Sequence, residues 1–379
     1  MKSKLKLLFP IAFLFLASGC WDKVELESRG FVVSLGIDLG GGESPFRYSV
    51  SASLPSVNGM RDEASNDSSK TVKKADGPDI SSALSLMGMS SSQKLYLGQA
   101  RLVIFGAELL GDEERFKEAI DACERNHEIG RKIFVLSTKG KASDILEADI
   151  GEEPSAGIYI ENYYRNASSS GTLKSHQGLS NIISDLRSGG NTLIPEVELK
   201  YTQGGDAYLE LGGCAAVKGF KLAGFLDSKQ TRGFEWVMGD ARGAEVSVPF
   251  ESGNEPLSVS SGRSKIRFQE IGGNLECNVD VKVRGSIAES GFSEESLYDA
   301  SALSKRSVKY EEAIKQEILD CAKLLQEDFG ADAYGFLDML RKRSYSAYKR
   351  VEGEWEENFK KMKIIPNVTV DIISAGAIK

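Results

Sequence analysis

The chain has 379 residues and a formal net charge of -8, and 41% of its residues are hydrophobic. A chain of this length exceeds one typical hydrophobic core and predicts two domains or three. Because nucleic acid repels so acidic a body, nucleic acid is not expected as a partner. The chain has two histidines, His127 and His176. It therefore offers few ligands for a zinc site and few bases for a histidine-based catalytic triad.

Residues 1–19 have the three-part build of a secretory signal peptide. Three lysines within the first six residues precede an apolar run from Leu7 to Ala17. The run has about eleven residues, whereas a permanent transmembrane helix takes roughly twenty, so we expect the segment to be removed. Its removal deletes three lysines and no acidic residue, which changes the net charge from -8 to -11.

Cys20 follows this segment directly. Ala17-Ser18-Gly19-Cys20 resembles the lipobox of bacterial lipoproteins, although Ala17 stands where leucine is usual. The resemblance implies a diacylglycerol thioether on Cys20, and no other cofactor is expected. Two acyl chains hold a protein stably on a bilayer, so membrane lipid becomes an expected partner. The alternative is an ordinary signal peptide with an incidental cysteine.

The residues after Cys20 are candidate membrane-proximal or partner contacts. Indole rings favour the headgroup zone of a bilayer, which makes Trp21 a candidate interfacial anchor. The alternative is that Trp21 packs against the first domain. The candidate contacts in this stretch are Trp21, Asp22, Glu25 and Leu26.

The first half of the chain predicts strands that alternate with helices. Strands are expected at 31–38 and 46–54 across a glycine-rich hairpin turn, with a long solvated loop from Pro55 to about Asp79. The glycines of that turn lack the spacing of a phosphate-binding loop. After the loop we expect helices and strands in alternation, at 79–89, 95–106, 111–126 and 132–138, with helices again over 143–190.

Two polar residues within the predicted strand 95–106 are candidate interface residues. Gln99 and Arg101 precede the apolar run Leu102 to Phe105. They either form local ion pairs or contribute to a surface for a partner.

The second half predicts paired strands followed by long helices. A hairpin with a short turn at Phe220 and a second hairpin across Gly272-Gly273 alternate apolar and polar residues, as in an antiparallel sheet with one wet face. Helices are expected over about 294–329, over 334–351 and around Trp355, with a last strand at 367–376. The fold class is therefore α+β. An N-terminal sheet of α/β type precedes a C-terminal domain of antiparallel sheet and long helices.

The expected domains are 20–200 and 201–379, and residues 201–245 are a candidate small middle module. Paired acidic and basic blocks with interleaved aromatic rings over 341–361 predict either core-facing rings or a protein-binding face. Phe336 and Trp355 are the candidate interface residues of this region.

The cysteines other than Cys20 continue apolar patterns of predicted elements. They are expected to be buried free thiols, although an even number on an exported protein also permits disulfides. The four are Cys123, Cys214, Cys277 and Cys321.

Five segments in order resemble the C-subunit lipoproteins of spore germinant receptors, the Ger(x)C family. They are GCWDKVELESRGFVVSLGID (19–38), GQARLVIFG (98–106), AAVKGFKLAGFLDS (215–228), TRGFEWVMG (231–239) and the long segment 329–376. One departure is Leu337, which stands where the family often has the second glycine of Gly-Phe-Gly.

The resemblance implies a subunit of a nutrient receptor. Its implied partners are a membrane-embedded A subunit and a transporter-like B subunit. Its implied location is the outer face of the spore inner membrane, where it serves as a scaffold or coupling module without catalysis. Two other classes compare less well. A solute-binding lipoprotein should show two doubly wound lobes, and a surface hydrolase should show a nucleophile elbow or metal ligands.

Overall fold

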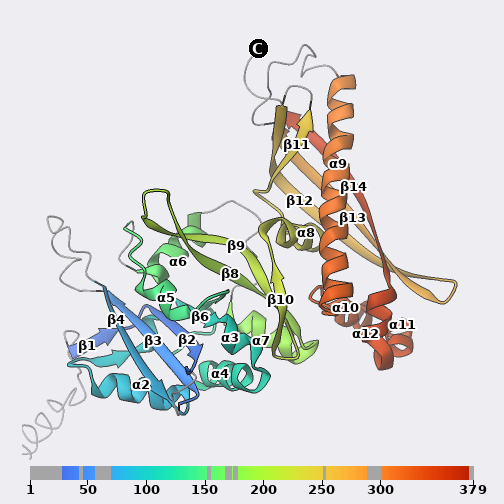
Figure 1. Cartoon of the computed structure of the whole chain (residues 1–379). Helices are drawn as coiled ribbons and strands as arrows, with labels where there is room; N and C mark the ends of the chain where they lie inside the picture. Colours follow the sequence, from blue (N-terminus) through green and yellow to red (C-terminus); the bar gives the residue numbers. More distant parts are fainter. Residues whose placement is uncertain are drawn as a thin grey trace, which may run out of the picture.

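The computed structural model describes residues 28–41, 46–55, 70–151, 155–166, 173, 178–250, 253–287 and 300–374. An eight-stranded sheet forms the N-terminal part and a four-stranded sheet forms the C-terminal part (Figure 1). This is the α+β architecture that the sequence predicts. Among the described residues, no helix is both long and apolar enough to span a membrane.

The eight-stranded sheet has the order β10-β9-β8-β7-β6-β2-β3-β4. Strands β6, β7 and β8 run parallel to β2, and the outer pairs are antiparallel. The predicted strands at 31–38 and 46–54 are confirmed as neighbours in the sheet. The strands are β2 (Ser34–Leu39), β3 (Tyr48–Pro55), β4 (Lys70–Gly77), β6 (Leu102–Gly106), β7 (Phe134–Thr138), β8 (Asn191–Tyr201), β9 (Ala207–Lys218) and β10 (Lys221–Leu226).

Strand β4 lies in the segment that the sequence predicts to be a solvated loop, so that prediction is wrong for residues 70–77. β4 pairs antiparallel with β3 at the edge of the sheet. Edge strands are commonly rich in lysine, which discourages pairing with other chains. The polar composition of KTVKKADG is compatible with an edge strand, although it led to the prediction of a loop.

The predicted strand 95–106 is divided in the structure. β5 (Lys94–Tyr96) pairs in parallel with β1 (Arg29–Phe31) as a separate two-stranded sheet. A 3₁₀ turn, η2 (Leu97–Gln99), then leads into β6 of the large sheet. The chain therefore changes sheets between Tyr96 and Leu102.

Helices cover both faces of the large sheet. Alternate residues of β6 face opposite sides, so Val103 and Phe105 join one core cluster while Leu102 and Ile104 join another. The first cluster is covered by α2 (Ile80–Met89), α3 (Ala107–Gly111), α4 (Glu113–Arg125) and α7 (Leu179–Ser188). The second is covered by α5 (Ala142–Glu147) and α6 (Ala156–Asn166).

The large sheet continues past residue 200, which lies within β8. The predicted hairpin turn at Phe220 joins β9 to β10. Leu193 of β8 and Cys214 of β9 belong to the same core cluster as Phe234 and Trp236 of α8 (Ser228–Met238). One continuous core therefore links the last strands of the large sheet to the C-terminal part.

The C-terminal sheet has the order β11-β12-β13-β14. Its strands are β11 (Glu245–Phe250), β12 (Gly253–Ile271), β13 (Asn274–Ile287) and β14 (Lys363–Ser374). The first three are antiparallel, as predicted, whereas β14 pairs in parallel with β13. The parallel pairing follows from the connection, because the helices between β13 and β14 return the chain to the end where β13 begins.

Residues 300–328 of the predicted helix 294–329 are helical, and residues 294–299 lie outside the described residues. α9 (Ala300–Lys323) ends in a π-helical turn, η3 (Leu324–Asp328). The predicted helix 334–351 divides at Ser344 into α10 (Phe336–Arg343) and α11 (Tyr345–Val351). A 3₁₀ turn, η4 (Glu352–Glu354), and α12 (Trp355–Lys361) follow.

The four cysteines of the described chain are buried and free, which confirms the prediction of core thiols. They are Cys123, Cys214, Cys277 and Cys321.

Candidate functional site

Asp38, the last residue of the Gly-Ile-Asp motif, is a buried helix cap. Its carboxylate accepts hydrogen bonds from the backbone N–H groups of Ala142 at 2.7 Å and Ser143 at 3.0 Å, in the first turn of α5. A Cβ atom on Gly106 would lie 2.2 Å from Asp38 Oδ1, so only glycine fits there. Burial raises the pKa of Asp38, and the two backbone donors oppose that rise. The motif residues 38 and 106 therefore hold α5 on the sheet.

Asp332 is also a buried helix cap, in the C-terminal part of the chain. Its buried carboxylate accepts from the backbone N–H groups of Phe336 and Leu337, each at 3.0 Å, and from Trp355 Nε1 at 3.1 Å. Gly335, with φ +70°, supplies the left-handed residue before α10. Leu337 lies within the first helical turn, so the glycine that the family often has there is not needed.

The predicted interface role of Phe336 is wrong, because its side chain is fully buried. Its ring stacks on Tyr334 with ring centroids 4.7 Å apart. Trp355 is half-buried and its indole donates to Asp332. These aromatic rings pack in the core, which leaves little of them for a partner.

Helices α8 and α9 meet at Gly233. A Cβ atom there would lie 2.3 Å from the backbone carbonyl oxygen of Glu317. The Glu317 carboxylate accepts from Trp236 Nε1 and from Arg232 Nε, both at 2.9 Å. The TRGFEWVMG segment therefore joins the large sheet to the long helix α9.

A buried hydrogen bond crosses the junction of the two parts. Leu173, in the chain between α6 and α7, donates its backbone N–H to Glu235 Oε1 of α8 at 3.1 Å. At the same junction, a Cβ atom on Gly224 of β10 would lie 2.3 Å from the ring of Phe329. The two parts are therefore in close contact at this junction.

Gln99 and Arg101 are exposed, and Arg101 forms an ion pair with Glu161 of α6. The local ion pair that the sequence suggested is therefore present. The predicted contacts next to the anchor lie outside the described residues, as does the candidate lipidation site. They are Cys20, Trp21, Asp22, Glu25 and Leu26.

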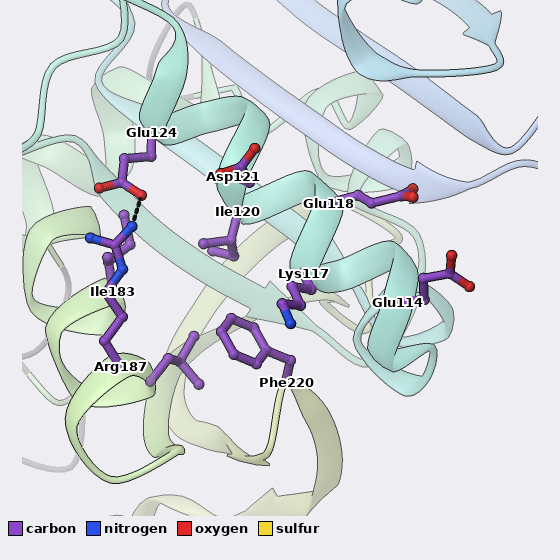
Figure 2. Close-up of a pocket in the computed structure, with 10 residues that line it drawn as sticks. Glu114, Lys117, Glu118, Ile120, Asp121, Glu124, Ile183, Arg187 and Phe220 are labelled. Atoms are coloured by element: carbon purple, nitrogen blue, oxygen red, sulfur yellow. Dashed lines mark hydrogen bonds and ion pairs between the residues drawn. The ribbon is translucent and has the colours of Figure 1, made fainter.

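A groove with an apolar floor lies between α4 and α7. Its volume is about 520 Å³. Figure 2 shows that Phe220, at the β9–β10 turn, places its ring between the two helices. The groove is lined by Glu114, Lys117, Glu118, Ile120, Asp121, Glu124, Ile183, Leu186, Arg187 and Phe220.

The rim of this α4–α7 groove carries four carboxylates and two cations. Glu124 of α4 pairs with Arg187 of α7 at 2.6 Å (Figure 2). The Tyr48 hydroxyl donates to Glu118 and, with the Arg115 guanidinium, holds the pKa of that carboxyl below its ordinary value. With four carboxylates and two cations, the rim is net acidic.

Phe220 adopts a left-handed backbone conformation, with φ +64°. It follows Gly219, at φ +56°, in a two-residue turn that normally takes asparagine and glycine. A bulky residue is strained in this conformation, and such strain gathers at functional sites. The ring lies under Lys117 Nζ, which is 5.5 Å from its centroid. The sequence located this turn but did not reveal the groove, because α4 and α7 are far apart along the chain.

A second charged cluster lies where β7 ends beside β8. Lys139 Nζ contacts the carboxylates of Glu196, at 3.0 Å, and of Glu198. Burial raises the pKa of Glu196 to about 7, whereas Lys139 and Lys200 lower the pKa of Glu198 to about 2. Elsewhere in the described ranges, as here, no three His, Cys, Asp or Glu side chains are grouped so as to hold a metal ion.

Comparisons with known proteins agree with the motifs. The family model "Spore germination protein N-terminal domain" matches residues 22–199, and "Spore germination B3/ GerAC like, C-terminal" matches residues 212–376. "Spore germination protein YndF" of Bacillus subtilis (strain 168) is 24% identical over 100% of both chains. "Spore germination protein KC" of the same organism is 22% identical over 93% of this chain and 90% of its own.

A solved structure has the same fold. The "Crystal Structure of the GerBC protein" superposes with a TM-score of 0.59 at 16% identity, and the match covers 93% of this chain and 100% of the other. The two family models lie in order along the chain and together cover most of it. This chain therefore belongs to the Ger(x)C family of spore germination proteins.

Proposed function

We propose that this chain is the lipid-anchored C subunit of a nutrient germinant receptor, held on the outer face of the spore inner membrane by diacylglycerol on Cys20. The observation that carries the proposal is the pair of family models, which match in order over residues 22–199 and 212–376. The lipobox-like Ala17-Ser18-Gly19-Cys20 supports the anchor.

The subunit acts as a rigid, non-catalytic scaffold that couples its membrane partners. The continuous core at α8 and the buried Leu173–Glu235 hydrogen bond support this role, because they tie the two sheets into one body. The family motifs support it too. Asp38, Asp332 and Trp236 each hold one element of the framework to another.

The α4–α7 groove is the proposed contact for the membrane-embedded A or B subunit. Its apolar floor and net acidic rim fit a helical segment with apolar side chains on one face and cations beside them. Phe220 is the central contact, since aromatic anchors dominate interface energetics.

The anchor is tested by Cys20→Ala in spores. We expect the folded protein to leave the inner-membrane fraction, because the acidic body has no other strong attraction for anionic lipid. Normal retention of the variant would mean that partner contacts provide most of the anchoring. Wild-type protein whose mass shows no acyl addition would contradict lipidation itself.

The groove is tested by Phe220→Asn, with Tyr208→Asn on β9 as the matched control. Asparagine tolerates the left-handed conformation at position 220, so this variant should fold while losing the ring. Tyr208 is 42% exposed and does not line the groove. We expect Phe220→Asn to reduce co-purification with the A and B subunits and to slow nutrient germination. Equal recovery with both variants would contradict the groove as the contact.

The alternative is a solute-binding lipoprotein of an uptake system. Such a protein would bury its ligand between two doubly wound lobes, whereas here a mixed sheet is joined to a four-stranded sheet. Titration calorimetry of the mature chain with amino acids and sugars separates the two functions. Saturable heat would favour solute binding by this subunit.

A further inference from the structure

Helix α2 presents an uncharged face to the outside. Residues 80–93 contain no Asp, Glu, Lys or Arg. Ile80, Ala83 and Met87 are buried against the sheet, whereas Leu86 and Met89 are 45% and 83% exposed. Surface helices normally place charged residues opposite their buried face. We call Ser85, Leu86 and Met89 the α2 outer face.

A wide groove of about 1040 Å³ runs along this helix, between α2 and α4. Its α2 side is uncharged: Leu84 and Met89 lie there with Ser81 and Ser85, and Leu95 extends it into β5. Its α4 side is polar and includes Asp121 and Arg125. A helix whose outer face is uncharged, next to a charged neighbour, fits the boundary between acyl chains and headgroups.

The α2 outer face lies close to the point where the chain emerges from the anchor. Arg29 of β1 pairs with Lys94 of β5, which follows Met89 by five residues. Five residues span at most about 18 Å, and paired strands lie about 5 Å apart, so Arg29 is within about 23 Å of Met89. Cys20 precedes Arg29 by nine residues, which reach at most about 32 Å. A lipid on Cys20 and the α2 outer face can therefore occupy one bilayer surface.

The β1–β5 pair adds the side chains that a membrane interface favours. The rings of Phe31 and Tyr96 meet edge to face at 5.9 Å, and the Arg29 guanidinium lies 5.0 Å from the Tyr96 centroid. Lys94 beside them is exposed. Aromatic rings and cations favour the headgroup region of anionic membranes.

We propose that the α2 outer face and the β1–β5 pair rest on the lipid bilayer beside the anchor. The inference rests on the proposed lipidation of Cys20 and adds an orientation to it. With α2 and β1 on the membrane, the four-stranded sheet lies at the far end of the molecule (Figure 1). The lipid attaches the protein to the membrane, and the α2 outer face determines its orientation there.

The test uses the mature, lipidated chain and a fluorescent probe that reports on its environment. Met89→Cys is labelled with a nitrobenzoxadiazole dye, since the four native thiols of the described chain are buried. Vesicles of phosphatidylglycerol and phosphatidylcholine should cause a blue shift and a several-fold rise in emission, which nitroxide lipids should quench. Tyr201→Cys, at the exposed end of β8, is the matched control and should not respond.

A second variant separates the orientation from the anchor. In a Met89→Glu background, a probe at Leu86→Cys should lose its response while the lipidated protein stays on the vesicles. Vesicle-bound protein with a silent Met89 probe would overturn the inference and leave the anchor intact. A response that appears only with the membrane-embedded partner subunits would overturn lipid as the occupant. A mass spectrum without acyl groups on Cys20 would overturn the anchor and, with it, this inference.

Discussion

Asp38 Oδ1 accepts a hydrogen bond from the backbone N–H of Ala142 at 2.7 Å, although the two residues are 104 positions apart. The bond fastens the start of α5 to the end of β2. It also explains why the Gly-Ile-Asp motif ends in aspartate. Among the described residues of the family motifs, Asp38, Gly233 and Asp332 each hold one element against another.

Asp38→Ala should lower the free energy of unfolding by about 1–3 kcal/mol, because two buried N–H groups lose their acceptor. Asp79→Ala is the matched control. Asp79 caps α2 by accepting from the N–H of Ser82 at 2.8 Å, but it is exposed, so water replaces it and about 1 kcal/mol or less is lost. Urea unfolding measures both. Equal losses would show that burial adds nothing at Asp38.

Gly233→Ala should destabilise the protein by about 1–3 kcal/mol, because the new Cβ would force α8 away from α9. Gly88→Ala in α2 is the control, since a Cβ there meets nothing within 4 Å. That change should stabilise the helix by about 0.5–1 kcal/mol. Thermal unfolding compares the two variants, and the same sign for both would contradict the close approach at Gly233.

The raised pKa of Glu196 predicts that the free energy of unfolding falls as pH rises. Its pKa is raised from 4.5 to about 7 by burial, so the folded state binds the proton more tightly than the unfolded chain does. The contribution of Glu196 to the free energy of unfolding is therefore greatest below pH 4.5 and falls as pH rises through about 7. Glu196→Gln removes this effect and should be more stable than the wild type by about 1–3 kcal/mol near pH 8. Near pH 4 the two should converge.

Glu198→Gln should change the free energy of unfolding in the opposite direction. Lys139 and Lys200 lower the pKa of Glu198 from 4.5 to about 2, so its stabilising effect is present above pH 4.5 and is lost as pH falls toward 2. The variant should be less stable than the wild type at neutral pH, and the difference should shrink in acid. Unfolding curves across the pH range measure both variants. Parallel curves for the two would contradict this assignment.

The four thiols of the described residues should not react with Ellman's reagent in the native protein. Cys123, Cys214, Cys277 and Cys321 are buried and free, and burial raises the pKa of Cys123 to about 12. All four thiols should react with the reagent once the protein is unfolded in denaturant. Rapid reaction of one thiol in the native protein would reveal a local opening.

Much of the large sheet was predictable from the sequence because its strands are short apolar runs. β2, β3, β6 and β7 lie where buried strands were expected. β4 was missed because an edge strand needs only one neighbour and tolerates lysine on its exposed side. The direction of β14 was missed because the pattern of a strand does not encode whether its neighbour runs parallel or antiparallel.

The sequence by itself determined the family, the order of the elements and the presence of a thiol where lipid is attached in lipoproteins, because these depend on local composition and on motifs in order. Only the tertiary structure decided which motif residues are buried. It placed Phe336 in the core and brought α4, α7 and Phe220 together as a groove. Apolar periodicity indicates the buried face of each element. A groove arises from contacts between elements far apart along the chain, and the local pattern does not show which elements meet.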